Sequence, residues 1–266
     1  MKQFPIKTIL LLLLSVTVSF SPAQKNVVLD NFYNNEISSK TGKPYHYLWE
    51  DKALSGFSEL GDLFVAKAAK LSTLKEKPTE KNLKNASIYI IVDPDTKQET
   101  ANPHFMDISA ANAIAKWVKK GGVLLLLTND YTNCELDSFN LLAEKFGMKY
   151  NKVLLHPELK AEAGMPRNYN SCACVNLPNH PLFTGVNKIF LKEVSSITCT
   201  GTAKAVLSEK GQALIAEAHY GKGYVLAVGD PWLYNEYIDH AHLPADFENL
   251  KAAHNLVDLL LKLAAK

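Results

Sequence analysis

Four short apolar runs in this chain each end in an acidic or amide side chain, and this repeated pattern constrains the fold most. The runs span residues 26–29, 86–92, 123–127 and 224–228. The polar residues that follow them are Asp30, Asp93 with Asp95, Asn129 with Asp130, and Asp230. Short and nearly continuous apolar runs are typical of strands that are buried on both faces of a sheet.

The segments between these runs have the apolar spacing of helices. We expect helices at residues 56–70, 109–119, 136–146 and 247–264, the first of them capped by Ser55. Strands that alternate with helices predict an α/β fold, an open and mainly parallel sheet with helices on both faces. Shorter alternating runs predict additional strands in the second half, some of them antiparallel, at 153–155, 189–191, 203–208 and 213–218.

The first 24 residues are typical of a secretory signal. Lys2 and Lys7 precede an apolar run over 8–20, and small residues follow it at 21–24. The run is shorter than the roughly 20 residues that span a bilayer. We therefore expect a secreted, periplasmic protein that is free of the membrane after cleavage, with a single domain over 25–266.

The composition and net charge limit the classes of molecule that this protein is expected to bind. The chain is 47% hydrophobic and 21% charged, as in ordinary globular proteins, and its formal net charge is +2. A charge this small gives no reason to expect nucleic acid as a partner. No glycine-rich nucleotide motif is present, so we expect no nucleotide cofactor.

The acidic strand ends predict a binding site. Open parallel sheets bind ligands outside the carboxyl ends of their strands, so we expect the polar residues named above to lie around one hollow. Carboxylates gathered there could divide acid and base work, with Asp230, Glu236 and Asp93 as the candidates. The alternative is that each aspartate only forms a turn or caps the next helix.

Two loops rich in aromatic residues indicate the class of ligand. Aromatic rings pack against the C–H faces of sugars while carboxylate and amide groups bind the hydroxyls, so we expect a carbohydrate. The candidate ligand-binding residues in these loops are Asn34, His46 and Trp49 in the first, and Trp232, Tyr234 and Asn235 in the second. The alternative is that the aromatic rings only cover the edge of the core.

Metal and cysteine chemistry have weaker support. Carboxylates with asparagine could hold calcium, but the Asp93–Asp95 segment lacks the later residues of an EF-hand loop. Cys172 and Cys174 have the wrong interval for a zinc motif, and we expect no metal site. Either of them could pair with Cys199 in a disulfide, or all four cysteines could be free thiols. Cys134 lies in an acidic segment that would raise the pKa of its thiol.

Several segments resemble a known module. Residues 88–100, 117–130, 139–151 and 221–238, the last containing GDPWLYNEY, look like the domain that follows the catalytic barrel in bacterial unsaturated rhamnogalacturonyl hydrolases. That domain is itself similar to the class I glutamine amidotransferase-like fold. The barrel has no counterpart in this chain, and neither does the cysteine elbow of amidotransferases. The resemblance therefore implies a place in rhamnogalacturonan or pectin breakdown and a possible partner glycoside hydrolase, but no reaction.

Three functions follow from these observations. The first is an accessory or carbohydrate-binding protein that holds sugar at the carboxyl ends of the strands. The second is a glycoside hydrolase or lyase that acts on unsaturated pectin oligosaccharides through paired carboxylates. The third is a structural or oligomerisation subunit of a hydrolase.

Overall fold

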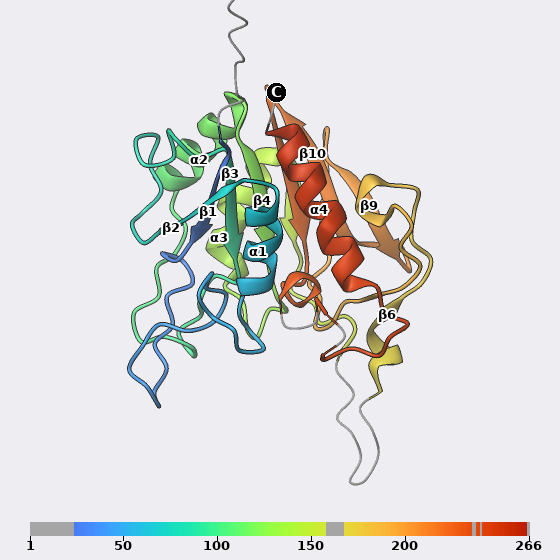
Figure 1. The fold of residues 1–266 in the computed structure, drawn as a ribbon. Coiled ribbons are helices and arrows are strands. Elements are labelled where there is room, and N and C mark those ends of the chain that lie inside the picture. The colour runs from blue at the N-terminus through green and yellow to red at the C-terminus, as the bar shows by residue number, and fades with distance from the viewer. Residues whose placement is uncertain (1–23, 158–167, 236–237, 240, 265–266) are drawn as a thin grey trace, which may run out of the picture.

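The computed structural model describes residues 24–157, 168–235, 238–239 and 241–264 (Figure 1). The predicted signal segment and the candidate Glu236 lie outside these residues. Within them, no helix is both long enough and apolar enough to cross a membrane.

A nine-stranded sheet forms the centre of the molecule. Its parallel part has the order β2-β1-β3-β4-β11. The bounds of these strands are β1 (Asn26–Asp30), β2 (Lys70–Leu74), β3 (Ile88–Val92), β4 (Val123–Leu127) and β11 (Gly223–Val228). All five run in the same direction, so their carboxyl ends meet at one edge, the lower edge in Figure 1.

Antiparallel strands extend the sheet beyond β11. They are β10 (Gln212–Tyr220), β8 (Ile197–Cys199) and β5 (Met148–Tyr150), with β9 (Lys204–Glu209) also paired to β10. A separate two-stranded sheet joins β6 (Ala173–Cys174) to β7 (Ile189–Phe190). The predicted fold class is confirmed: an α/β fold with an open, mainly parallel sheet and additional strands in the second half.

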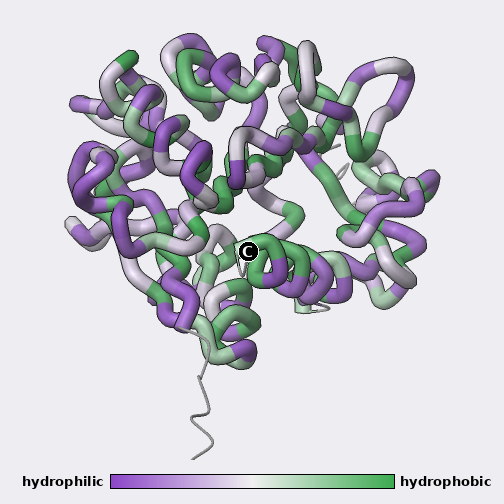
Figure 2. The backbone as a smooth tube through the Cα atoms, turned by 90° about the horizontal axis from the view of Figure 1, so that it is seen from above, coloured by the Kyte–Doolittle hydropathy of each residue, from purple (hydrophilic) through white to green (hydrophobic). Residues whose placement is uncertain are grey.

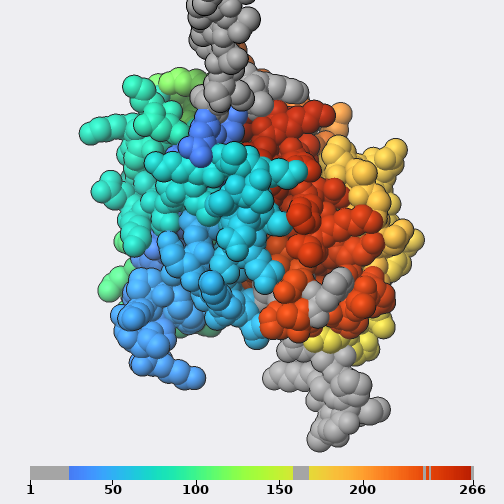
Figure 3. Space-filling model, in the orientation of Figure 1, coloured from blue at the N-terminus to red at the C-terminus, as the bar shows by residue number. Residues whose placement is uncertain are grey.

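Helices cover both faces of the sheet. One face carries α1 (Ser58–Ala66) and α4 (Asn249–Leu263), which lie side by side in Figures 1 and 3. The other face carries α2 (Ile108–Lys119) and α3 (Leu136–Ala143). Short 3-10 helices are η1 (Glu144–Phe146), η2 (Tyr169–Cys172), η3 (Pro181–Phe183) and η4 (Trp232–Tyr234).

The core is divided into two layers because side chains alternate along each strand. In β3, Ile90 packs with the α1 and α4 layer, whereas Tyr89 and Ile91 pack with the α2 and α3 layer. Both layers are fully buried at this strand, which explains why β3 is continuously apolar in sequence. In Figure 2, hydrophilic turns lie around the periphery, and hydrophilic and hydrophobic residues alternate along α4.

Two details differ from the sequence-based expectations, and the structure decides a third point that the sequence left open. Helix α1 begins at Ser58, and the backbone carbonyl of Ser55 accepts a hydrogen bond from Tyr47 instead of capping the helix. Residues 153–155 form no strand and contribute a single bridge between Leu155 and Val194. All four cysteines are free thiols, so neither Cys172 nor Cys174 is bonded to Cys199.

Candidate functional site

The chain turns sharply where β3 ends. Asp93 has a φ of 42°, in the left-handed region that a non-glycine residue seldom adopts. Its backbone N–H donates to the carbonyl of Leu127, 2.8 Å away, which ties the turn to the end of β4. Backbone strain of this kind is concentrated at functional sites, where the surrounding contacts hold it in place.

The segment after β1 is bonded to this turn. Asn34 donates from Nδ2 to the carbonyl of Asp93 at 2.9 Å, and the backbone N–H of Asn35 donates to Oδ2 of Asp95 at 2.9 Å. In return, the N–H of Asp95 donates to the carbonyl of Tyr33 at 2.9 Å. These three hydrogen bonds hold the two loops together at the carboxyl edge of the sheet.

Four acceptor oxygens in these loops have no hydrogen-bond donor among the described residues. They are the Oδ1 atoms of Asn34, Asn35, Asp93 and Asp95, which we call the acceptor cluster. Asp93, Asp95 and Asn34 are 6%, 1% and 2% exposed, so bulk water reaches them little. A buried polar atom without a partner costs about 1–3 kcal/mol, and four acceptors together indicate a place for a ligand that supplies donors.

Further carboxylates surround the acceptor cluster. Burial raises the pKa of Asp95 to about 7; the hydrogen bond from the N–H of Asn35 opposes this rise, and the nearby charges of Glu36 and Glu99 add to it. Burial also raises the pKa of Asp93 well above its usual range. Glu99 adds to the effect, and hydrogen bonds from the side chain of Tyr47 and from the amide of Asn129, 3.4 Å from Oδ2, oppose it. The region thus favours protons, hydroxyl donors or a cation.

Glu36 binds the aromatic loop to this region. Its Oε1 lies 2.8 Å from Nδ1 of His46, and its Oε2 accepts a hydrogen bond from the hydroxyl of Tyr45 at 2.8 Å. His46, a predicted ligand-binding residue, is therefore occupied as a partner of Glu36. Glu36, Asn35 and Glu99 were not among the sequence candidates, because none of them follows a strand directly.

A pocket of about 490 Å³ adjoins the acceptor cluster. Asn35 belongs to both, and the other lining residues include Asn31, Lys75, Thr100, Asn102 and His104. The ring of His104 stacks on Phe32 with centroids 3.9 Å apart, so an aromatic face is fixed at the wall. A larger cavity of about 630 Å³ lies near the opposite edge of the sheet, beside Trp117 and Gly122, and contains none of the predicted site residues.

Asp30 and Asp130 do not share this site. Asp30 accepts from the backbone N–H groups of Phe32 and Tyr33 at 3.1 and 2.7 Å, and from the hydroxyl of Tyr89. Asp130 accepts from the N–H and hydroxyl of Thr132, and from the amide of Asn133 at 2.7 Å. Both aspartates form local turns, as the structural alternative expected.

Asp230 is also fully engaged by the backbone. Its Oδ1 accepts from the N–H of Trp232 at 2.7 Å, and its Oδ2 accepts from the N–H of Lys192 at 2.8 Å. Burial raises the pKa of Asp230 well above its usual range. Both oxygens of Asp230 thus already accept hydrogen bonds from the protein, and its predicted role on a ligand stays a prediction.

The predicted aromatic residues take different positions. Trp49 donates from Nε1 to the carbonyl of Ser72 at 3.1 Å and packs against Phe57 and Phe64 in the core. Tyr234 is wholly buried, and Nζ of Lys192 lies 3.3 Å from the ring centroid of Trp232. Trp49 and Tyr234 thus belong to the core. Asn235 is buried, with 3% of its surface exposed, and neither its Nδ2 nor its Oδ1 is hydrogen-bonded to a described residue.

The raised pKa of Asp95 predicts how stability depends on pH. Between about pH 4 and about pH 7 the folded protein keeps a proton on Asp95 that the unfolded chain has lost, so rising pH favours unfolding. We expect the free energy of unfolding to fall by about 2–4 kcal/mol over this range. Urea unfolding at a series of pH values measures it, and Asp95→Asn should flatten the profile. Parallel profiles for the two proteins would contradict the assignment.

Comparison with known proteins identifies the fold but no family. No family model matches the chain, and no curated protein matches it. Among solved structures, the mmIFT52 N-terminal domain is similar with a TM-score of 0.66 and 15% identity, over 89% of this chain and 97% of that domain.

Two cytoplasmic proteins from Salmonella typhimurium are also similar. The first, from strain LT2, has a TM-score of 0.53 at 14% identity, over 90% of this chain and 99% of that one. The second has a TM-score of 0.50 at 15% identity, over 90% and 98%. At these identities the likeness shows a common α/β fold, and function has to be argued from the site.

Proposed function

We propose that this protein is an exported carbohydrate-binding protein that takes part in the breakdown of plant polysaccharide. The observation that carries the proposal is the acceptor cluster beside a pocket lined by both polar and apolar groups. Sugar hydroxyls are donors, and they would give the Oδ1 atoms of Asn34, Asn35, Asp93 and Asp95 the hydrogen bonds that the described residues do not supply.

The pocket suits an oligosaccharide with two kinds of sugar. At the acceptor cluster, the nearby charges of Glu36 and Glu99 disfavour the carboxylate of a uronic acid, so a neutral sugar such as rhamnose fits there best. Lys75, on the pocket wall, could pair with a uronate carboxylate on the adjacent sugar. The ring of His104 offers a face for the C–H side of a sugar. This pattern is consistent with a rhamnogalacturonan fragment.

Calorimetric titration of the full chain with rhamnogalacturonan oligosaccharides tests the proposal. We expect saturable binding and a raised melting temperature, and weaker binding of homogalacturonan fragments of equal length. Asn35→Ala, in the pocket wall, should lower the affinity about tenfold, which corresponds to about 1.4 kcal/mol.

Two controls accompany this titration. Lys222→Ala, in the cavity near the opposite edge, should bind like the unaltered protein. Since calcium would use the same carboxylate and amide oxygens, each titration is made with and without a chelator. Absence of heat with every oligosaccharide, together with unchanged melting temperatures, would overturn the proposal.

A second candidate function is hydrolysis at the same place. Asp93 and Asp95 lie two residues apart and both have raised pKa values, Asp95 near 7, as a general acid in a glycosidase requires. They would replace Asp230, whose oxygens accept backbone hydrogen bonds. Product analysis on rhamnogalacturonan fragments decides between the two functions, because a binding protein releases no new reducing ends. Partnership with a glycoside hydrolase belongs to the same proposal.

A further inference from the structure

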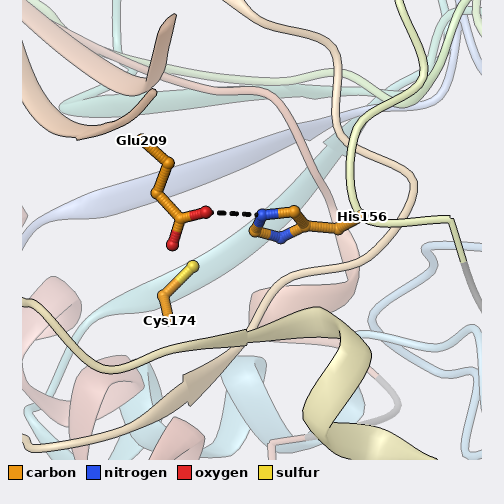
Figure 4. A group of neighbouring side chains, drawn as sticks. All are labelled: His156, Cys174 and Glu209. Atoms are coloured by element: carbon orange, nitrogen blue, oxygen red, sulfur yellow. Dashed lines mark hydrogen bonds and ion pairs between the residues drawn. The ribbon is translucent and has the colours of Figure 1, made fainter. Parts of the chain in front are cut away.

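A second group of polar side chains lies at the same edge of the sheet, beyond β11. It consists of His156, Cys174 and Glu209, whose ligand atoms all lie within 4.8 Å of one another (Figure 4). Nε2 of His156 is 2.8 Å from Oε2 of Glu209, and the sulfur of Cys174 points toward the same carboxylate. We call these three residues the mixed cluster.

Three separate segments build the mixed cluster. Glu209 is the last residue of β9, at the tight connection to β10. Cys174 is the last residue of β6 and pairs with Ile189 of β7. His156 follows the bridge between Leu155 and Val194, and its φ of 49° is another left-handed, non-glycine conformation. Surrounding contacts hold this conformation, and it places the imidazole where the other two side chains meet.

The imidazole of His156 is oriented as in metal-binding histidines. Its Nδ1 lies 2.9 Å from the carbonyl of Leu191, and a carbonyl can only accept, so the proton is on Nδ1. Nε2 is thereby directed into the mixed cluster. Metal-binding histidines almost always donate their second ring N–H to a carbonyl or carboxylate in this manner, which fixes the tautomer and raises the basicity of the ligand nitrogen.

We infer that His156, Cys174 and Glu209 form a binding site for a zinc ion. Nitrogen, thiolate sulfur and carboxylate oxygen are the ligands that zinc takes in proteins, whereas calcium and magnesium prefer oxygen alone. Without a metal, the contact between Nε2 and the carboxylate needs a shared proton, and the thiol keeps its own. Zinc replaces both protons, so binding releases them to solvent and becomes tighter as pH rises.

A cysteine nucleophile fits the same residues less well. Such a nucleophile needs the imidazole as its base, but Nε2 of His156 faces Glu209. Cys174 has Glu209 as its own hydrogen-bond partner, and burial together with that carboxylate raises the pKa of the thiol. A positive ion among the three groups reverses this effect, because it stabilises the thiolate.

The mixed cluster borders a cavity of about 240 Å³. His156 and Glu209 both line it, together with Leu154, Pro157, Lys210 and Gln212. Structural zinc sites have four protein ligands, whereas sites that act on a substrate have three and keep a position for water or a ligand. Three ligands beside a cavity correspond to the second arrangement.

Titration of the metal-free full chain with cobalt chloride tests the inference. Cobalt reports a thiolate ligand through a charge-transfer band in the near ultraviolet, and zinc chloride should then displace it. We expect a single ion per chain and weakening by about a hundredfold or more in Cys174→Ser, since even outer-shell changes cost 10–100-fold. Zinc should also raise the melting temperature of the unaltered protein but not that of the variant.

Cys172→Ser is the matched control. Cys172 lies two residues away, is equally buried and bonds to the carbonyl of His156 through its sulfur, so it probes the same segment without supplying a ligand. We expect its cobalt spectrum to match that of the unaltered protein. Glu209→Gln serves as a second ligand variant if Cys174→Ser does not fold. Absence of the charge-transfer band, or its persistence in both ligand variants, would overturn the inference.

Discussion

Replacing Asp93 by asparagine is expected to stabilise the ligand-free protein by about 1–2 kcal/mol and to weaken its binding of oligosaccharide by about tenfold or more. Asparagine has nearly the same shape, does not have to take up a proton to fold into this buried turn, and its amide group brings donors. Asp93 is 6% exposed, and the neighbouring Oδ1 atoms of Asn34 and Asp95 lack donors. The new amide could satisfy one of them, which removes an acceptor that the sugar would use.

Higher stability together with weaker binding in Asp93→Asn would show that Asp93 serves ligand binding and lowers the stability of the ligand-free protein. Urea unfolding measures the first change and calorimetric titration the second. Asp30→Asn is the matched control, since both oxygens of Asp30 already accept protein hydrogen bonds. It should lose stability and keep its affinity. A loss of stability in Asp93→Asn with unchanged binding would contradict the role that we assign to Asp93.

Replacing Asp230 by alanine is expected to cost about 3 kcal/mol of unfolding free energy, because two buried N–H groups lose their acceptor. The N–H groups of Trp232 and Lys192 both point at this carboxylate, and Asp230 is wholly buried. Asp230→Asn should cost less, since one amide oxygen can still accept. Affinity for the oligosaccharide should not change in either variant that folds.

Asp51→Ala provides the comparison for Asp230. Asp51 accepts a similar local bond from the N–H of Ala53, but at the exposed surface, so its loss should cost less than about 1 kcal/mol. Chemical unfolding of the three variants measures these differences. If Asp230→Ala were no more costly than Asp51→Ala, the carboxylate would be free, and the original assignment of Asp230 to catalysis would regain support.

The fold could be predicted where a run of residues is compatible with only one kind of secondary structure. β4 was placed correctly at residues 123–127 because five apolar residues stand between Gly122 and Thr128. β5 and β8 were missed because each has three residues and pairs only with distant partners, Met148 with Cys199 and Tyr150 with Ile197. Strands this short depend on tertiary pairing, so their own residues carry little signal.

The site could be predicted only in part, because aspartates at strand ends look alike in sequence. Asp230 and Asp93 are both followed by proline, yet Asp230 receives the N–H of the residue two positions on. At Asp93 the corresponding N–H belongs to Asp95 and donates to Tyr33 instead. Which oxygens remain without donors is therefore decided by the packing of two loops, and no local pattern reports it.

No pattern in the sequence indicates the mixed cluster. His156 and Glu209 are 53 positions apart, and Cys174 lies between them without a metal-binding interval. The β9–β10 connection and the β6–β7 pair bring the three residues to one place, so their proximity follows from topology alone. A search for motifs in the sequence could not have found them.

The most direct test of the central claim is a crystal structure of the full chain with a rhamnogalacturonan oligosaccharide. The account predicts sugar hydroxyls about 2.7–3.0 Å from the Oδ1 atoms of Asn34, Asn35, Asp93 and Asp95, with the rest of the ligand in the adjoining pocket. A sugar bound elsewhere, with ordered waters donating to all four oxygens, would contradict it.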